Sequence, residues 1–191
     1  MGFTGREPPF FFLKPADAML VVNTGETASL PYPSLTKNLH HEIELVVAIG
    51  TGGKNIALAQ AEQHIFGYAV GLDMTRRDLQ NEMKTLGRPW CIGKGFDHSA
   101  PIGPITPKEA AGDITHVAIS LQVNQVVRQN STVEQQIWNI AETIAQLSAA
   151  WEPQPGDLIY TGTPAGVGAV LPGDTLKGSI SGLTDIELKV V

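Results

Sequence analysis

Two glutamates inside an apolar run, Glu42 and Glu44, constrain this chain more than any other feature. From Ile43 to Ile49 the residues are mostly branched and apolar, which favours a strand. Since side chains alternate between the two faces of a strand, both glutamates point the same way, together with Val46 and Ala48. The sequence therefore predicts two carboxylates on a partly buried face.

Two like charges on a buried face cost free energy unless a cation lies between them. A divalent cation is the simplest partner, and hard cations such as Mg²⁺ bind carboxylate oxygens. The alternative is an edge strand whose polar end lies in water, and the pattern by itself favours that alternative. The rest of the chain has to decide between a metal site and a solvated edge.

Length and composition narrow the class of protein. With 191 residues the chain can bury a sizeable core, and we expect one domain over residues 1–191. Its net charge of −6 argues against a nucleic-acid partner. Cys91 is the only cysteine, so no internal disulfide can form. The sequence has no long apolar run and no signal-peptide pattern, so we expect a cytoplasmic protein with no membrane partner.

Glycine (20 residues) and proline (13 residues) are frequent, which favours short strands and turns over a helical bundle. Apolar runs predict strands at 10–15, 43–49, 66–73 and 157–161, and a strand pair over 117–127 that turns at 124–125. Helical spacing predicts helices at 57–65, 74–86 and 132–151, the last of them capped by Thr132. Residues 90–97 are expected to form a glycine-flanked loop around Lys94.

Several catalytic motifs can be excluded. His41 begins a run like H-E-x-x-H, but Leu45 stands where the second histidine belongs. The loop at 50–55 lacks the first glycine of a phosphate loop, and the glycine-rich turn at 162–168 lacks the spacing of a dinucleotide site. No G-x-S-x-G elbow is present. Cys91 has apolar neighbours on both sides, so we interpret it as a packing residue.

A combination of short stretches is more specific than any one of them. These stretches are His40-His41-Glu42-Ile43-Glu44, Gly71-Leu72-Asp73-Met74-Thr75 with Arg77-Asp78, Lys94, and Thr161-Gly162-Thr163-Pro164. Together they resemble the fumarylacetoacetate hydrolase superfamily, over residues 10–191. The chain is most similar to its small single-domain branch, which includes acylpyruvate hydrolases, oxaloacetate decarboxylases and fumarylpyruvate hydrolases. Within that branch, residues 2–5 and 8–15 look most like fumarylpyruvate hydrolases.

The resemblance implies a fold, a metal and a substrate class. The fold would be α+β and predominantly β, a mixed β-sandwich or β-roll with few helices, and the protein would be a homodimer. Glu42, Glu44 and Asp73 would bind Mg²⁺ or Mn²⁺. A small 2-oxo acid would be the substrate, surrounded by the residues that the resemblance carries over: Arg77, Gln80, Lys94, Thr163 and Lys14.

The implied reaction is hydrolysis of the C–C bond of an acylpyruvate, with fumarylpyruvate in aromatic-compound catabolism as the best candidate. Cleavage leaves a pyruvate enolate, whose charge the metal and Lys94 would offset. The attacking water needs a base, which in this family is a His–Glu pair on a helix before the F-L-K-P segment. Only nine residues precede Phe10 and none is histidine, so we expect metal and substrate binding but weak hydrolysis.

Two other classes of protein fit the same motifs. One is a metal–enolate enzyme of another kind, either an oxaloacetate decarboxylase or tautomerase or a 2-hydroxyhepta-2,4-diene-1,7-dioate isomerase. Decarboxylation needs no attacking water, so it would better tolerate the absence of the His–Glu pair. The other class is a non-catalytic metal-binding protein, which would bind the ion and turn over no 2-oxo acid.

Overall fold

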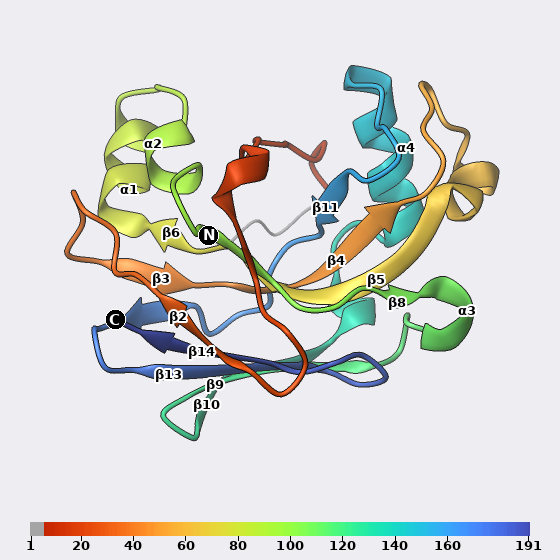
Figure 1. Ribbon diagram of the computed structural model, residues 1–191. Coiled ribbons are helices and arrows are strands. Elements are labelled where there is room, and N and C mark those ends of the chain that lie inside the picture. The colour runs from red at the N-terminus through yellow and green to blue at the C-terminus, as the bar shows by residue number, and fades with distance from the viewer. Residues whose placement is uncertain (1–5) are drawn as a thin grey trace.

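Two large β-sheets and one small sheet form the framework of the computed structural model, which describes residues 6–191 (Figure 1). The six-stranded sheet has the order β1–β7–β5–β4–β11, with β8 beside β5; its strands are β1 (Met19–Val21), β4 (Ile43–Ile49), β5 (Ile65–Leu72), β7 (Ala100–Ile102), β8 (Thr106–Pro107) and β11 (Leu158–Tyr160). The five-stranded sheet has the order β10–β9–β13–β14–β2; its strands are β2 (Thr27–Leu30), β9 (Ala118–Val123), β10 (Val126–Thr132), β13 (Thr175–Ile180) and β14 (Ile186–Val190). The small sheet joins β12 (Gly168–Val170), β3 (Leu39–His41) and β6 (Thr75–Arg76).

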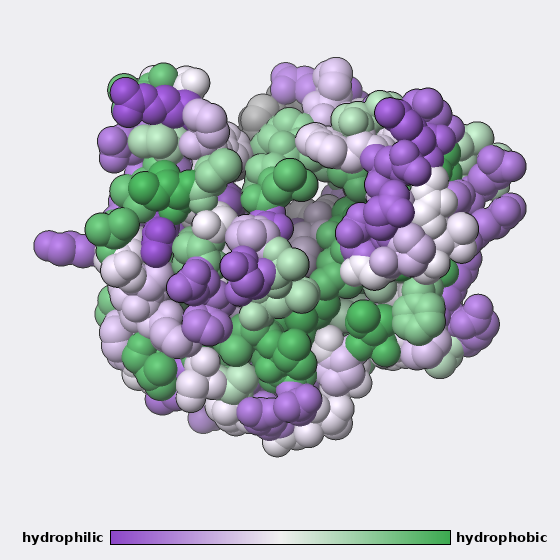
Figure 2. All heavy atoms as spheres, turned by 45° about the horizontal axis from the view of Figure 1, so that its top comes forward, coloured by the Kyte–Doolittle hydropathy of each residue, from purple (hydrophilic) through white to green (hydrophobic). Residues whose placement is uncertain are grey.

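Helices are few and mostly short. They are α1 (Arg77–Thr85), α2 (Cys91–Lys94), α3 (Lys108–Ala111), α4 (Ile140–Ala150) and the 3-10 turns η1 (Ala16–Ala18), η2 (Leu58–His64) and η3 (Val133–Gln135). In Figure 1, α1 and α2 lie at the upper left and α4 at the upper right. Figure 2 looks onto this side and shows a hollow between these two regions, with hydrophobic side chains at its border.

The main core lies between the two large sheets. One face of β4 supplies Ile43, Leu45, Val47 and Ile49, and the five-stranded sheet supplies Ile119, Leu121, Leu176 and Leu188. The other face of β4 is also buried, where Val46 packs with Ala69 and Ile102. The predicted strand at 43–49 and the alternation of its side chains are therefore confirmed, and the fold is the expected mixed β-sandwich.

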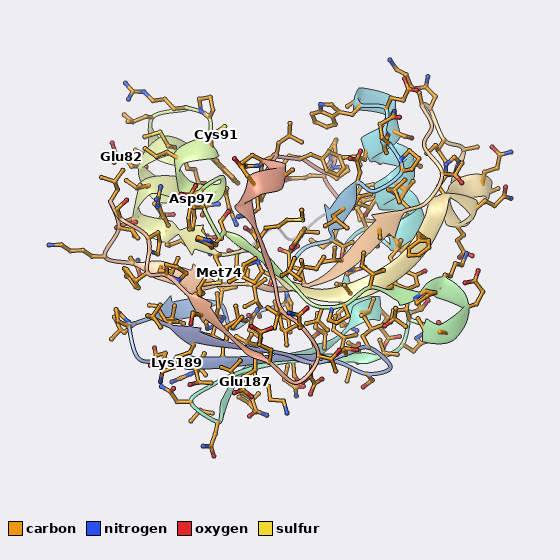
Figure 3. The ribbon with its side chains drawn as sticks, in the orientation of Figure 1. Met74, Glu82, Cys91, Asp97, Glu187 and Lys189 are labelled. Atoms are coloured by element: carbon orange, nitrogen blue, oxygen red, sulfur yellow. The ribbon has the colours of Figure 1, made fainter. Side chains whose placement is uncertain are left out.

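Figure 3 illustrates the two sides of the sandwich. Met74, which is fully buried, lies near the middle of the molecule, just after the end of β5. Glu187 and Lys189 lie on β14 at the outer side of the five-stranded sheet, while Leu188 between them points into the core. This alternation along β14 has the period of two that is typical of a strand.

The predicted strand pair is a β-hairpin of β9 and β10. Asn124 and Gln125 both have positive φ, at 50° and 67°. Two consecutive residues of this kind are typical of a type I′ turn, whose twist matches that of the paired strands. The prediction of a turn at these two residues is confirmed.

Two predicted elements are wrong. Residues 10–15 form no strand, and the rings of Phe10 and Phe12 instead contact Trp90, with centroids 5.3 and 6.2 Å apart. Prolines before and within this segment remove the donors that a ladder needs. The helix predicted at 132–151 begins only at Ile140, because β10 continues to Thr132.

Two further differences are smaller. The segment predicted as a helix at 57–65 is a 3-10 helix, and the loop expected at 90–97 contains the single turn α2. The resemblance found at 2–5 concerns residues that lie outside the described part of the chain, 6–191. Within residues 6–191, no helix combines the length and the apolar character needed to cross a membrane.

Candidate metal centre

Three carboxylates meet where β4 and β5 lie side by side. Glu44 is on β4, Glu42 directly precedes that strand, and Asp73 directly follows β5. The antiparallel register of the two strands brings their ends together, and the Asp73 amide donates to the Glu42 carbonyl at 2.9 Å. One oxygen of each carboxylate lies within 4.8 Å of the others, and all three residues are buried. The structure thus brings together the three residues that the sequence singles out.

Lys94 lies between two of these carboxylates, Glu42 and Asp73. Its ammonium, at the end of α2, is 2.8 Å from Glu42 Oε2 and 2.7 Å from Thr75 Oγ1, and it also donates to Asp73 Oδ2. Burial acts to lower the pKa of Lys94, but Asp73 and Glu42 outweigh it, so the pKa is raised. The ring of Phe12 covers the same ammonium, with its centroid 5.0 Å away.

Glu44 is the carboxylate without a cation. No Lys or Arg of the described chain forms an ion pair with it, and its one hydrogen-bond donor among the described residues is the Gly162 N–H, 2.8 Å from Oε2. Burial, followed by the charges of Asp73 and Glu42, raises its pKa well above the usual range. A buried carboxylate in this position is costly unless a positive charge joins it.

Lys14 lies beside Asp73 and three backbone carbonyls. Its ammonium donates to the carbonyls of Met74 (3.2 Å), Ser99 (3.0 Å) and Lys94, and forms an ion pair with Asp73 Oδ1 at 2.8 Å. These contacts connect Lys14 to the loops that carry Asp73 and Lys94.

Asp73 is held between two ammonium groups. Burial acts to raise its pKa, but Lys14 and Lys94 outweigh it, so the pKa is lowered and the carboxylate stays ionised. Its Oδ1 atom is buried, and the Lys14 ammonium lies 2.8 Å away as its ion-pair partner. A buried carboxylate oxygen with unused lone pairs is the kind of ligand that a hard cation takes.

Arg77 and Gln80 border the centre from α1. The Arg77 guanidinium donates both to Glu42 Oε1 and to Gln80 Oε1. Gln80 is 2 % exposed, and its Nε2 group is buried with no hydrogen-bond partner in the described chain. Gly93 permits the close approach of α2 to α1, because a Cβ at this position would lie 2.9 Å from the backbone nitrogen of Gln80. The Gln80 amide thus has an unused donor beside the carboxylates.

Thr163 lies on the loop after β11, and its hydroxyl is engaged within the protein. It donates to the Ile43 carbonyl at 2.8 Å and accepts from Gln129 Nε2 at 2.8 Å. Gln129 is a residue that the sequence analysis missed. The available signal was weak: a single glutamine in a polar strand, although it is the one fully buried residue of β10.

The two histidines beside the centre are not free bases. His40 Nε2 bonds to Asn38 at 2.9 Å, and Nδ1 accepts from Arg77 at 3.4 Å. Burial and the charge of Arg77 lower its pKa to about 4, so it is neutral at pH 7. His41 is buried, and its Nδ1 atom lies 2.9 Å from Gln129 Oε1. These contacts engage both ring nitrogens of His40 and one of His41.

A pocket of about 470 Å³ lies elsewhere. Arg76, Phe96 and Asp97 line it together with residues 31–34 and His98, and none of the three carboxylates does. Arg76 points away from the centre and stacks over Phe96, 4.3 Å from the ring centroid. The pocket is therefore separate from the candidate metal centre.

The residues present fit a hard divalent cation. Three buried carboxylates offer oxygen ligands at close range, Asp73 Oδ1 has unused lone pairs, and Glu44 lacks a cation. Oxygen ligands of this kind suit Mg²⁺ and Mn²⁺ better than softer metals.

Comparisons with known proteins agree with this geometry. The chain is 45% identical over 184 residues to a fumarylpyruvate hydrolase of Ralstonia sp, covering 96% of this chain and 93% of that protein. It is 38% identical to a mitochondrial oxaloacetate decarboxylase of Dictyostelium discoideum, covering 96% and 83%. A crystal structure of fumarylpyruvate hydrolase from Pseudomonas aeruginosa, in complex with Mn²⁺ and pyruvate, superposes with a TM-score of 0.95 at 59% identity, covering 97% of this chain and 80% of that one.

The family assignment rests on nearly the whole chain. The sequence profile named fumarylacetoacetate (FAA) hydrolase C-terminal matches residues 3–191, a range that includes both large sheets and all three carboxylates. The chain therefore belongs to the fumarylacetoacetate hydrolase C-terminal family.

Proposed function

We propose that this protein is a metal-dependent hydrolase that cleaves the C–C bond of an acylpyruvate, with fumarylpyruvate as the best candidate substrate. Glu42, Glu44 and Asp73 would hold Mg²⁺ or Mn²⁺. The observation that carries the proposal is Glu44, a fully buried carboxylate that has no cation in the described chain. The similar enzymes of Ralstonia and Pseudomonas, the second with Mn²⁺ and pyruvate bound, support the substrate class.

The charges around the centre favour an anionic substrate. The cations Lys14, Lys94 and Arg77 already face the carboxylates Glu42 and Asp73. With Glu44 included, three positive and three negative side chains balance. A divalent cation would therefore leave the centre with excess positive charge, which attracts a 2-oxo acid anion.

The side chains around the centre have separate roles in this proposal. A bound divalent metal would supply Lewis-acid stabilisation of the pyruvate enolate that forms when the bond between the acyl carbonyl and C3 breaks. Lys94 would place a second positive charge beside that enolate. Arg77 and the unused Gln80 amide donor would orient the substrate carboxylate. Thr163 would border the substrate from the opposite loop.

We assign Lys14 a supporting role. All its N–H groups are engaged by backbone carbonyls, so it would keep Asp73 ionised and in place without touching the substrate. This differs from the substrate-binding role that the family resemblance implies, and the reason is the saturation of its donors.

Decarboxylation or tautomerisation of oxaloacetate is the second candidate. Both nitrogens of His40 are engaged, and His41 is buried against Gln129. Neither histidine is therefore placed to activate water, and decarboxylation needs no attacking water. The similarity to the Dictyostelium oxaloacetate decarboxylase supports the same alternative.

We also propose that the protein is a homodimer. Several large apolar side chains lie on its surface, among them Leu35 (72 % exposed), Leu13 (68 %) and Val21 (62 %). Burying such side chains against a second copy would be favourable. Light scattering on the purified protein tests this directly, and a mass of one chain, 20.4 kDa, would rule the dimer out.

A substrate panel tests the proposed reaction. Fumarylpyruvate, a second acylpyruvate and oxaloacetate are each incubated with and without Mn²⁺, and loss of ultraviolet absorbance is followed. Metal-dependent release of pyruvate and fumarate from fumarylpyruvate is expected. Turnover of oxaloacetate alone would favour the second candidate, and Mn²⁺ binding without any turnover would favour a binding protein.

A further inference from the structure

Gln129 connects three segments of the chain from a fully buried position on β10. Its Oε1 atom accepts from the Ile43 N–H at 3.1 Å and lies 2.9 Å from His41 Nδ1. Its Nε2 group donates to Thr163 Oγ1 and to the Pro164 carbonyl, both at 2.8 Å. An amide side chain has two acceptor sites and two donors, so every hydrogen bond that Gln129 can make is made.

The orientation of the amide follows from its partners. A backbone N–H can only donate and a carbonyl can only accept, so Oε1 must face Ile43 and Nε2 must face Pro164. Oε1 therefore accepts from His41 as well, which requires that His41 carries its proton on Nδ1. An amide turned by 180° would place Nε2 against the Ile43 N–H and Oε1 against the Pro164 carbonyl. Only the observed orientation therefore satisfies all four partners.

The backbone brings Gln129 and the Thr163 loop into direct contact. The register of β10 against β9 shifts between Val127 and Gln129, which turns the glutamine inward. Gly166, at φ 101°, approaches β10 so closely that a Cβ would lie 2.0 Å from the Arg128 carbonyl oxygen. The loop that Gln129 holds also carries Gly162, whose N–H donates to Glu44.

We propose that Gln129 is a positioning residue, which holds the 161–164 loop against β4, the strand that carries Glu44. In this position the Gly162 N–H faces Glu44, and the Thr163 side chain faces the substrate. Its amide touches residues on both sides of Glu42 and reaches Glu44 through the loop. The inference rests on the proposed function for its meaning in catalysis, but its geometric part can be measured without substrate or metal.

The first test compares Gln129→Leu with Gln122→Leu. Gln122 lies on the neighbouring strand β9, is half-buried and has no hydrogen bond from its side chain in the described structure. Amide hydrogen exchange is measured by NMR on metal-free protein. We expect exchange at Gly162 to become at least about tenfold faster in Gln129→Leu and to stay unchanged in the control, since the loss of several buried hydrogen bonds frees the loop. Unchanged exchange at Gly162 in Gln129→Leu would overturn the proposal.

The second test measures Mn²⁺ affinity and oxalate binding by calorimetry in the same variants. We expect both to weaken about tenfold in Gln129→Leu, and the double variant with Thr163→Val to bind no more weakly than the weaker single variant. Additive losses would contradict a shared action through Thr163. If the wild-type protein binds no Mn²⁺, the proposed function fails, whereas hydrogen exchange still decides the role of Gln129.

A shorter amide keeps the proposal testable if Gln129→Leu does not fold. Gln129→Asn retains the donor and acceptor atoms, but its side chain is one methylene too short to reach both His41 and Thr163. We expect faster exchange at Gly162 and a changed ¹⁵N shift of His41 Nδ1, which carries the proton in the wild-type protein. Wild-type exchange together with a wild-type His41 signal would overturn the proposal.

Discussion

The case for a metal centre depends most on Glu44, which is buried and forms no ion pair in the described chain. Its place in an apolar strand and its orientation beside Glu42 follow from the alternation of side chains along β4. The sequence does not show that Glu44 forms no ion pair in the described chain, because this depends on where Lys14, Lys94 and Arg77 lie in space. This missing partner is the reason for proposing Glu44 as a metal ligand.

Glu44→Gln should stabilise the metal-free protein and abolish Mn²⁺ binding. In the presence of EDTA, the wild-type protein must either bury an unpaired carboxylate or protonate it, since burial raises the pKa of Glu44, and both cost stability that the amide restores. Each kcal/mol gained raises the melting temperature by about 2–4 °C in a chain of this size. Thermal unfolding with EDTA measures the gain, and the exposed Glu62→Gln is the control. A lower melting temperature for Glu44→Gln would contradict the account.

Lys94→Met should lower kcat without weakening Mn²⁺ binding. In the proposed reaction the ammonium would offset the enolate charge, and losing such a contact costs on the order of a hundredfold in rate. The same change leaves Glu42 and Asp73 more negative, so the metal should bind at least as tightly. Steady-state kinetics and calorimetry provide the two numbers, with Lys84→Met on the exposed face of α1 as control. Unchanged turnover would make Lys94 structural only.

At the scale of elements, the start of α4 shows how a local signal can be overlooked. Asn139 accepts from the Glu142 N–H at 2.9 Å, and Glu142 Oε2 accepts from the Asn139 N–H at 3.0 Å. This reciprocal pair is a capping box, and its Asn-x-x-Glu letters are present in the sequence. The predicted cap, Thr132, instead ends β10.

Replacing the true cap should cost more than replacing the predicted one. Asn139→Ala removes the acceptor for Glu142 N–H and should lower the free energy of unfolding by about 1 kcal/mol. Thr132→Ala removes only one contact, to Glu134, at 3.3 Å and should have a much smaller effect. Urea unfolding of both variants makes the comparison. An equal loss in the two would contradict the assignment of the helix start.

Asp78 ties α1 to the loop before β3, and this contact should depend on pH. Burial acts to raise its pKa, but the Thr36 hydroxyl and the N–H groups of Lys37 and Leu79 lower it overall. A carboxyl with a lowered folded pKa stabilises the protein above its unfolded pKa of about 3.9, and the contribution is lost as the pH falls through the folded value. This window lies below about pH 4.

Asp78→Asn should therefore be less stable than the wild-type protein at neutral pH, with a difference that shrinks below about pH 4. Urea unfolding of both proteins across that range gives the difference directly. A difference that stayed constant into the acid range would show that the Asp78 charge contributes nothing.

Strands were more predictable than segments with prolines or caps. The alternation at 43–49 and the turn at Asn124–Gln125 follow local rules, and both are confirmed. The apolar letters of residues 10–15 satisfy the rule for a strand, yet this segment packs its rings on Trp90 and its Lys14 side chain on three carbonyls. These contacts come from residues distant in the chain, which no local pattern contains.

At the scale of the whole molecule, the six-stranded sheet places the start of β4 beside the end of β5, with α1 and α2 next to them. Alternation along a strand predicted that Glu42 and Glu44 share a face, whereas Asp73 joined them only through the family resemblance. The contacts of Lys14 and Gln129 were not predictable. Those that Lys14 makes with Met74 and Ser99, and those that Gln129 makes with His41 and Ile43, join residues 60 or more positions apart in the chain.

Titration of the protein with Mn²⁺ by calorimetry, with and without oxalate, tests the central claim most directly. Oxalate mimics the pyruvate enolate, and it should bind only when the metal is present. The account predicts one Mn²⁺ per chain, metal-dependent oxalate binding, and loss of both in Asp73→Asn. Equal oxalate binding in EDTA, or wild-type Mn²⁺ affinity in Asp73→Asn, would contradict a metal centre formed by Glu42, Glu44 and Asp73.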